Sequence, residues 1–172
     1  MGLFQNERIA LILIFVTFIF VTNEAMGAAL TVPPALPTSQ TVDQGQGIYV
    51  SINSPSGGTP PYHYQWQAII PGSSTFTNTT LCSAPTTQVC SFTTTTSTTI
   101  GNYQFRVRVQ DNRVFPSPRV TYSTAANVTV NTQLSLDSPT ASNTVMDQGQ
   151  RSRINVNNAY TGTPPYTYQW FV

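Results

Sequence analysis

The chain has 172 residues and a net charge of +1 at pH 7, and only 8% of its residues are charged. All seven basic residues are arginine and six acidic residues balance them, so the sequence lacks the concentrated basic patch that nucleic-acid binding needs. Soluble domains usually contain about 25% charged residues. Here threonine, serine, asparagine and glutamine supply the polar surface instead, as is common in secreted surface proteins.

The N-terminal segment has the pattern of a secretory signal. Residues 9–21 are 13 almost uninterrupted apolar residues, and small residues follow at 25–29. A signal contains an apolar region of about 7–15 residues, whereas a membrane span needs about 20. We therefore predict a signal peptide over residues 1–29. An uncleaved signal-anchor is the alternative, and it is the only predicted membrane contact. In both cases the rest of the chain is extracellular, either secreted or at the cell surface.

Two motifs occur twice, and the second copy of each follows the first by 104 residues. They are Gly-Thr-Pro-Pro-Tyr-X-Tyr-Gln-Trp at residues 58–66 and 162–170, and Asp-Gln-Gly-Gln at residues 43–46 and 147–150. A shared offset over two separated motifs indicates a tandem repeat. We predict a complete first repeat over residues 30–132 and a truncated second repeat over residues 133–172.

Alternation of apolar and polar residues predicts short strands along the first repeat. After an extended Pro-rich segment, this period occurs at residues 48–52, 62–67, 90–94, 102–110, 120–122 and 126–130. The second repeat keeps two apolar positions of the 48–52 strand as Ile154 and Val156, which we expect to point inward. About seven short strands, separated by Gly, Pro and Asn turns and without a helical period, predict an all-β fold, an antiparallel β-sandwich.

Two of these strands carry the aromatic residues of the predicted core. Tyr62, Tyr64 and Trp66 share one face of the first strand, and Tyr103 and Phe105 share one face of the second. Each aromatic side chain can bury roughly 150–250 Å² of surface. We therefore place these five residues at the centre of the fold. A sugar-stacking platform is the alternative for the first three.

Two cysteines and two sequons indicate covalent modifications of an exported protein. Cys82 and Cys90 are predicted to form a disulfide that holds the irregular segment 71–90, with a free or metal-bound pair as the alternative. Asn78 and Asn127 begin Asn-X-Thr sequons and are candidates for N-glycosylation.

The sequence offers no catalytic constellation of nucleophile, base and orienting group. The only histidine, His63, is predicted on the solvent face of its strand, and the second repeat has Thr167 at the equivalent position. Asp43 and Asp111 could meet at one end of the sandwich and bind calcium. We favour the interpretation that both form turns, because one or two carboxylates are few ligands for this ion. We therefore expect no catalytic residue, no metal and no cofactor.

Four arginines lie along one predicted strand and the loop after it: Arg106, Arg108, Arg113 and Arg119. They could contact an acidic glycan or a neighbouring domain. We favour a solvated surface, because charges on a strand discourage edge-to-edge aggregation.

The matched motifs, together with residues 101–111 (GNYQFRVRVQD) and 128–131 (VTVN), resemble the immunoglobulin-like, PKD-like repeats of archaeal cell-surface proteins. The resemblance covers nearly all of the exported chain. It implies β-sandwiches strung in arrays, in structural or adhesive roles. It also implies that Trp66 is the core tryptophan of the third strand and Tyr103 the tyrosine near the start of the sixth. Phe105 stands where antibody domains have a cysteine, so their inter-sheet disulfide is absent here.

These observations predict a non-enzymatic structural or adhesive protein of the cell surface, whose partners are neighbouring repeats and, as further candidates, surface glycans or envelope proteins. The alternative is an accessory region, either a spacer or a carbohydrate-binding module, of a secreted enzyme whose catalytic domain lies beyond Val172. We expect the sequence to be a fragment of a longer array, because the second repeat has only about three predicted strands. A true terminus would need a partner chain that completes the sandwich by strand addition.

Overall fold

The computed structural model describes residues 27–171, so the predicted signal peptide lies almost entirely outside the described residues. The first repeat contains β1 (Ser39–Asp43), β2 (Gly47–Ser51), β3 (His63–Ile69), β4 (Thr77–Asn78), β5 (Val89–Thr93), β6 (Gly101–Gln110), β7 (Val120–Tyr122) and β8 (Ala126–Asn131). The second repeat contains β9 (Thr140–Ala141) and β10 (Ile154–Asn155). Within residues 27–171, no helix is long and apolar enough to cross a membrane.

Two sheets form the first repeat. The larger sheet has the order β1-β8-β6-β3-β4, and β7 pairs with β6 beyond the end of β8. The smaller sheet consists of β2 and β5, which pair antiparallel with Val50 opposite Cys90. Alternate residues of both sheets, such as Val50 and Val107, are fully buried in one common core. The predicted all-β sandwich is therefore confirmed.

One strand pair departs from the predicted antiparallel arrangement. β1 runs parallel to β8, with Asp43 opposite Asn131. Before β1 the chain follows the smaller sheet, where Leu36 and Ser51 exchange two backbone hydrogen bonds of 2.8 Å. It then crosses to the edge of the larger sheet. Because no hairpin joins β1 to β8, their connection does not impose antiparallel pairing.

The core is centred on β3 and β6, which pair with Trp66 opposite Val107. Trp66 and Phe105 are both fully buried. The ring of Tyr103 stacks on Phe105 with 6.2 Å between the ring centroids, and its hydroxyl donates a hydrogen bond to the carbonyl of Thr99 at 2.7 Å. A tyrosine near the start of the sixth main strand that bonds to backbone a few residues upstream is typical of immunoglobulin-like sandwiches.

Tyr64 on β3 and Tyr62 just before the strand are only half-buried. Tyr62 and Tyr64 pack against the edge of the core cluster. The hydroxyl of Tyr62 donates a hydrogen bond to the carbonyl of Gly57 at 2.6 Å, which ties the loop before β3 to the strand. Burial therefore increases along this face towards Trp66.

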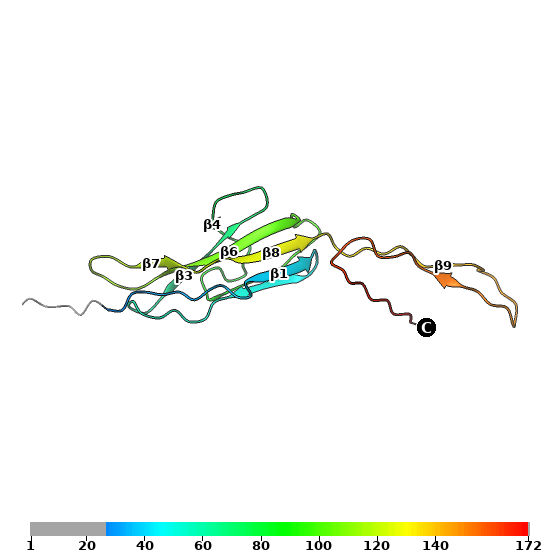
Figure 1. Cartoon of the computed structure of the whole chain (residues 1–172), viewed down its shortest axis with the longest axis horizontal. Helices are drawn as coiled ribbons and strands as arrows, with labels where there is room; N and C mark the ends of the chain where they lie inside the picture. The colour runs from blue at the N-terminus through cyan, green and yellow to red at the C-terminus, as the bar shows by residue number, and fades with distance from the viewer. Residues whose placement is uncertain (1–26, 172) are drawn as a thin grey trace, which may run out of the picture.

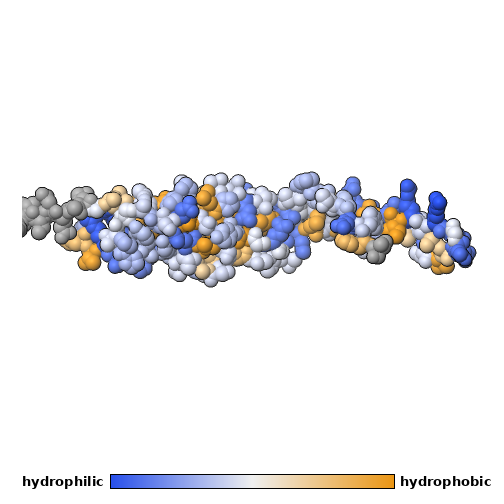
Figure 2. Space-filling view, turned by 90° about the horizontal axis from the view of Figure 1, so that it is seen from below, coloured by the Kyte–Doolittle hydropathy of each residue, from blue (hydrophilic) through white to orange (hydrophobic). Residues whose placement is uncertain are grey.

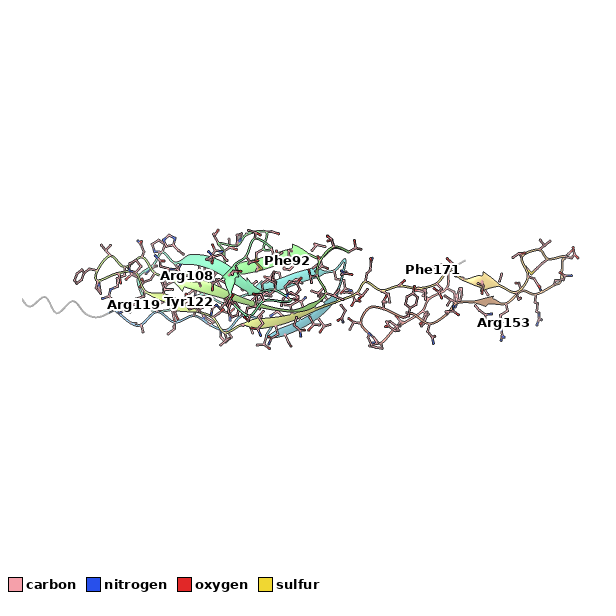
Figure 3. All side chains as sticks on the ribbon, turned by 90° about the horizontal axis from the view of Figure 1, so that it is seen from above. Phe92, Arg108, Arg119, Tyr122, Arg153 and Phe171 are labelled. Atoms are coloured by element: carbon pink, nitrogen blue, oxygen red, sulfur yellow. A yellow bond between two sulfur atoms is a disulfide. The ribbon has the colours of Figure 1, made fainter. Side chains whose placement is uncertain are left out.

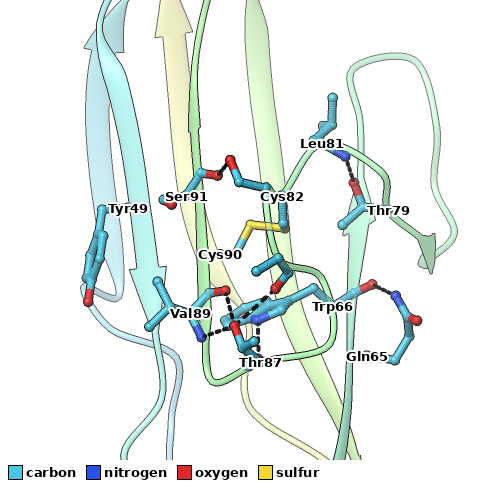
Figure 4. The surroundings of a disulfide bond; sticks show 12 residues. Tyr49, Gln65, Trp66, Thr79, Leu81, Cys82, Thr87, Val89, Cys90 and Ser91 are labelled. Atoms are coloured by element: carbon cyan, nitrogen blue, oxygen red, sulfur yellow. Dashed lines mark hydrogen bonds between the residues drawn. A yellow bond between two sulfur atoms is a disulfide. The ribbon is translucent and has the colours of Figure 1, made fainter.

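The irregular segment before β5 is fastened to Trp66. Cys82 and Cys90 form the predicted disulfide, which is thereby confirmed. Inside the loop that it closes, the carbonyl of Thr87 accepts a hydrogen bond from the Trp66 indole Nε1 at 2.9 Å (Figure 4). The carbonyl of Pro85 accepts another from the Trp66 backbone N–H at 2.8 Å. The disulfide loop thus covers the core tryptophan.

The second repeat extends from the end of the first repeat that lies opposite the N-terminal segment (Figure 1). Its only regular structure within the described residues is the two-residue ladder of β9 and β10. Ile154 is 56% exposed and Trp170 is also 56% exposed, and apolar surface is visible along this part of the molecule in Figure 2. The expectation that Ile154 points inward is therefore wrong, because no second sheet within residues 27–171 covers that face.

Candidate interaction surface at the junction of the two repeats

The two aspartates considered as alternative calcium ligands lie at opposite ends of the first repeat. Asp43 ends β1 beside Asn131, and β8 pairs with the beginning of β6 at Gly101. Asp111 follows the last residue of β6, which has ten residues and therefore a length of about 33 Å. The expectation that Asp43 and Asp111 could meet is wrong. No group of three or more His, Cys, Asp or Glu residues within positions 27–171 is placed to hold a metal ion.

Asp111 fastens the N-terminal end of the first repeat. Its side chain is 1% exposed and accepts hydrogen bonds from the backbone N–H groups of Arg119 at 2.6 Å, Thr59 at 3.2 Å and Arg113 at 3.4 Å. Burial on its own raises the pKa of this carboxyl, but the three amides and the Arg119 charge outweigh burial and hold the pKa below its ordinary value. Asp111 is therefore a buried carboxylate that ties the loop before β3 to the loop between β6 and β7.

The four arginines of the predicted surface group are held by separate local partners. The guanidinium of Arg106 lies between the rings of Phe76 and Tyr122, at 4.0 and 4.3 Å from their centroids. Arg108 donates to the side chain of Gln110, and Arg113 donates to a backbone carbonyl in its own loop. Figure 3 shows Arg108 beside Tyr122 on the sheet, with Arg119 towards the N-terminal end.

Arg119 closes the N-terminal end of the repeat. Its guanidinium donates hydrogen bonds to the carbonyls of Gly27 and Ala28, at 3.0 and 2.9 Å. The four cations therefore do not converge on one anion site, and each has a role within the sandwich or its loops.

The remaining predicted site residues are exposed. His63 lies on β3 at the rim of an open hollow that is also lined by Gln65, Arg108 and Tyr122. The sequon residues Asn78 on β4 and Asn127 on β8 are both exposed. These positions leave both asparagines accessible for modification.

The C-terminal end of the first repeat contacts the second repeat through polar side chains. The hydroxyl of Thr163 donates a hydrogen bond to Asp43 Oδ1 at 2.6 Å and accepts one from Asn131 Nδ2 at 2.9 Å. The backbone N–H of Thr163 donates to Asp43 Oδ2 at 3.1 Å. Asp43 and Asn131 stand side by side because β1 and β8 are paired in parallel. The parallel pairing therefore builds this contact surface.

The chain at Gln133, where the second repeat begins and which serves as the linker, adds further hydrogen bonds to the same junction. Gln44 accepts a bond from the backbone N–H of Gln133 at 3.4 Å and donates to the carbonyls of Thr96 and Thr98. The hydroxyl of Thr161 donates to the carbonyl of Gln133. The Asp-Gln-Gly-Gln turn thus contacts its own repeat, the linker and the next repeat.

Glycine is required at the junction. Gly162 has a φ of 83°, and a Cβ at this position would lie 2.9 Å from Asp43 Oδ2 and 3.1 Å from Leu134. The equivalent Gly58 has a φ of 64°, and its Cβ would lie 2.9 Å from Asp111 Oδ2. A left-handed backbone and a close carboxylate both disfavour any other residue.

Sequence reasoning identified both halves of this contact as repeated motifs, but it did not identify the contact. Asp43 and Thr163 are 120 residues apart. Each was assigned to a turn or loop of its own repeat. The only signal for a functional role was the recurrence of both motifs at the same offset.

The sheet order, the buried tryptophan on β3 and the hydroxyl bond of Tyr103 together define the first repeat as an immunoglobulin-like β-sandwich. No protein-family model matches the chain, and no curated protein sequence matches it. Among solved structures, the chain is similar to the N-terminal four Ig domains of Dscam1 isoform 4.44, with 17% sequence identity and a TM-score of 0.36. The match covers 60% of this chain and 21% of that chain.

Proposed function

We propose that the chain is part of a non-enzymatic structural or adhesive protein, secreted or at the cell surface, in which tandem immunoglobulin-like repeats act as spacers or contact modules. The observation that carries this proposal is the junction, where Thr163 of the second repeat is hydrogen-bonded to Asp43 and Asn131 at the end of the first. A spacer needs each repeat to begin where the previous one ends, and the parallel pairing of β1 with β8 provides that geometry.

Further observations support an extracellular role. Cys82 and Cys90 form a disulfide. Disulfides persist in oxidising compartments and are rare in the cytosol. The exposed sequon residues Asn78 and Asn127 leave room for glycans on opposite edges of the larger sheet, at β4 and near β1. The partners that this function implies are neighbouring repeats first, and surface glycans or envelope proteins second.

Antibodies raised against residues 30–132 test the location and the class of function. We expect them to label intact, unpermeabilised cells of the source organism, or to detect the protein in the medium, and we expect external protease to remove the cell-bound signal. Labelling that required permeabilisation would contradict the proposal. Hydrolysis of a polysaccharide or peptide by the affinity-purified native protein would support the alternative of a secreted enzyme instead.

A further inference from the structure

The two Asp-Gln-Gly-Gln turns have the same internal structure, although only the first contacts another repeat. In the first turn, the N–H of Asp43 donates to Gln46 Oε1 at 2.8 Å, and the N–H of Gln46 donates to the Asp43 carbonyl at 3.0 Å. In the second, the same two bonds join Asp147 and Gln150, each at 3.1 Å. The glycines of the two turns have φ angles of 94° and 88°. The turn therefore forms without a partner.

The carboxylates of the two turns differ in what they bind. Asp43 is 8% exposed, and within residues 27–171 its carboxylate makes hydrogen bonds only with Thr163. Asp147 is exposed, and its carboxylate makes no hydrogen bond to any described residue. The hydrogen bonds within each turn use only the backbone N–H and carbonyl of the aspartate, so neither carboxylate is needed to form the turn. Asp147 is therefore equivalent to Asp43, but its carboxylate is exposed, whereas the carboxylate of Asp43 is bonded to Thr163.

Comparison of the Gly58-Thr59 loop with the Gly162-Thr163 loop shows which hydrogen bond to Asp43 any repeat could form with the repeat before it. The backbone N–H of Thr59 donates to Asp111 within its own repeat, so this amide is not available to a neighbour. The hydroxyl of Thr59 is exposed and makes no hydrogen bond among the described residues. In the second repeat it is the equivalent hydroxyl, that of Thr163, which lies 2.6 Å from Asp43 Oδ1. The hydroxyl-to-carboxylate bond can therefore be formed by a repeat whose amide is already bound.

We propose that the Asp-Gln-Gly-Gln turn of each repeat is a docking site for the Gly-Thr-Pro-Pro loop of the next repeat in the chain, and that the turn at Asp147 is such a site for a third repeat. The carboxylate accepts the threonine hydroxyl, and the glycine lets the loop backbone approach the carboxylate without a Cβ contact. This inference rests on the proposed function, because it assumes repeats in tandem. It adds the chemistry that fixes each repeat on its neighbour, a heterologous contact that propagates in one direction along the chain.

Substitution of the two equivalent threonines tests the joint in the full chain. In wild type, residual dipolar couplings of the first repeat and of residues 133–171 should fit one common alignment tensor. Thr163→Val removes the hydroxyl that bonds to Asp43 and Asn131, and we expect the two repeats to require separate tensors. Thr59→Val is the matched control at the exposed equivalent position, and it should retain the common tensor.

A common tensor in Thr163→Val, or its loss in Thr59→Val, would overturn the proposal. Gly162→Ala provides a second variant, because its Cβ would lie 2.9 Å from the Asp43 carboxylate, and we expect it to separate the tensors as Thr163→Val does. In all three variants, the amide signals of the first repeat should change only close to the substituted residue or close to Asp43 and Asn131, which would restrict the effect to the joint.

A lengthened chain tests the role of Asp147 directly. Because Val172 is equivalent to Ala68, joining a second copy of residues 69–172 after Val172 completes the second repeat and begins a third. We expect Asp147→Ala to release the third repeat from the common tensor and to leave the first two repeats aligned. Asp43→Ala should release the second repeat from the first. If the third repeat keeps the common alignment tensor in Asp147→Ala, the proposal that Asp147 is a docking site is wrong. These results concern orientation in solution, so a failure of the cell-labelling experiment would leave them unchanged.

Discussion

Asp111 shows how one buried side chain can organise two loops of this sandwich. Its carboxylate lies at the N-terminal end of the first repeat and binds the backbone amides of Thr59, Arg113 and Arg119. A buried carboxylate is stable only when its oxygens are bonded. The loop before β3 and the loop after β6 therefore depend on the charge state of one side chain.

The lowered pKa of Asp111 predicts a specific loss of stability in acid. Because the folded-state pKa lies below that of the unfolded chain, about 3.9, the carboxylate stabilises the fold fully above this pH. This contribution is lost as the pH falls through the lower folded-state pKa. We expect Asp111→Asn to be less stable than wild type at pH 7, with a difference that narrows in acid. Calorimetric Tm values across pH 2–7 measure it.

Asp147→Asn is the control for this prediction, since it alters an exposed carboxylate without hydrogen bonds to the described residues. It should follow the wild-type curve. A difference between Asp111→Asn and wild type that stayed constant with pH would show that the Asp111 charge does not contribute to stability.

The two tryptophans occupy equivalent positions in the repeats but opposite environments. Trp66 is 0% exposed, whereas Trp170 is 56% exposed. In Trp170→Phe, we expect the remaining fluorescence of Trp66 to be blue-shifted and insensitive to iodide. In Trp66→Phe, the remaining fluorescence of Trp170 should be red-shifted and quenched by iodide. Equal quenching of the two variants would mean that Trp66 is not in the core.

At the scale of elements, the disulfide loop acts as a cover for the core. Cys82 and Cys90 close a loop whose carbonyls, at Pro85 and Thr87, both bond to Trp66. The chain between β4, which has only two residues, and β5 has no other regular strand, so this irregular loop covers the core there. Its hold on Trp66 therefore depends on two hydrogen bonds and one covalent link.

Removal of the disulfide should loosen this cover. We expect the Cys82→Ala/Cys90→Ala double variant to lose about 2–3 kcal/mol of unfolding free energy, from the greater entropy of the unfolded chain. We also expect faster hydrogen exchange at the Trp66 indole, because the loop that accepts its hydrogen bond opens more often. Urea unfolding and NMR exchange measure the two effects. Unchanged indole exchange would show that the loop covers Trp66 without help from the disulfide.

The strands could be predicted because their signal is local. The alternation in residues 102–110 reflects one buried and one exposed face, and β6 (Gly101–Gln110) follows it closely. The core aromatics Trp66 and Phe105 follow from the same pattern, and both are fully buried. Ile154 has the same local pattern but is exposed, because burial also requires a second sheet.

The direction of β1 could not be predicted, because pairing between distant strands leaves no mark in either strand. The direction of β1 also decides whether Asp43 and Asp111 can meet, as the calcium alternative required. If β1 ran antiparallel to β8, it would run parallel to β6, and Asp43 would lie near Asp111 at the end of β6. The observed parallel pairing places Asp43 beside Asn131 instead, where it contacts Thr163.

At the scale of the whole molecule, the two ends of the first repeat have different tasks. Asp111 ties the N-terminal end to itself through backbone groups of the first repeat, and the guanidinium of Arg119 bonds to the carbonyls of Gly27 and Ala28, just before the repeat. Asp43 and Asn131 at the C-terminal end bind the following repeat. A module with one self-contained end and one receptive end can be added repeatedly in one direction, as a tandem spacer requires.

Two large apolar side chains near the end of the described residues are exposed. Trp170 is 56% exposed and Phe171 is 82% exposed. Trp170 is equivalent to Trp66, which is buried against side chains of β2 and β5, whereas Phe171 is equivalent to Gln67 on the other face of β3. In the proposed array, a second sheet would bury Trp170 as it buries Trp66.

The proposed spacer requires that the two repeats keep one extended arrangement in solution, and small-angle X-ray scattering of residues 27–172 tests this most directly. Measured at the outlet of a size-exclusion column, the monomer should give a scattering curve that the single extended arrangement of Figure 1 reproduces, both at low salt and at high salt. A curve that required a mixture of orientations, or a second repeat folded back along the first, would contradict the account.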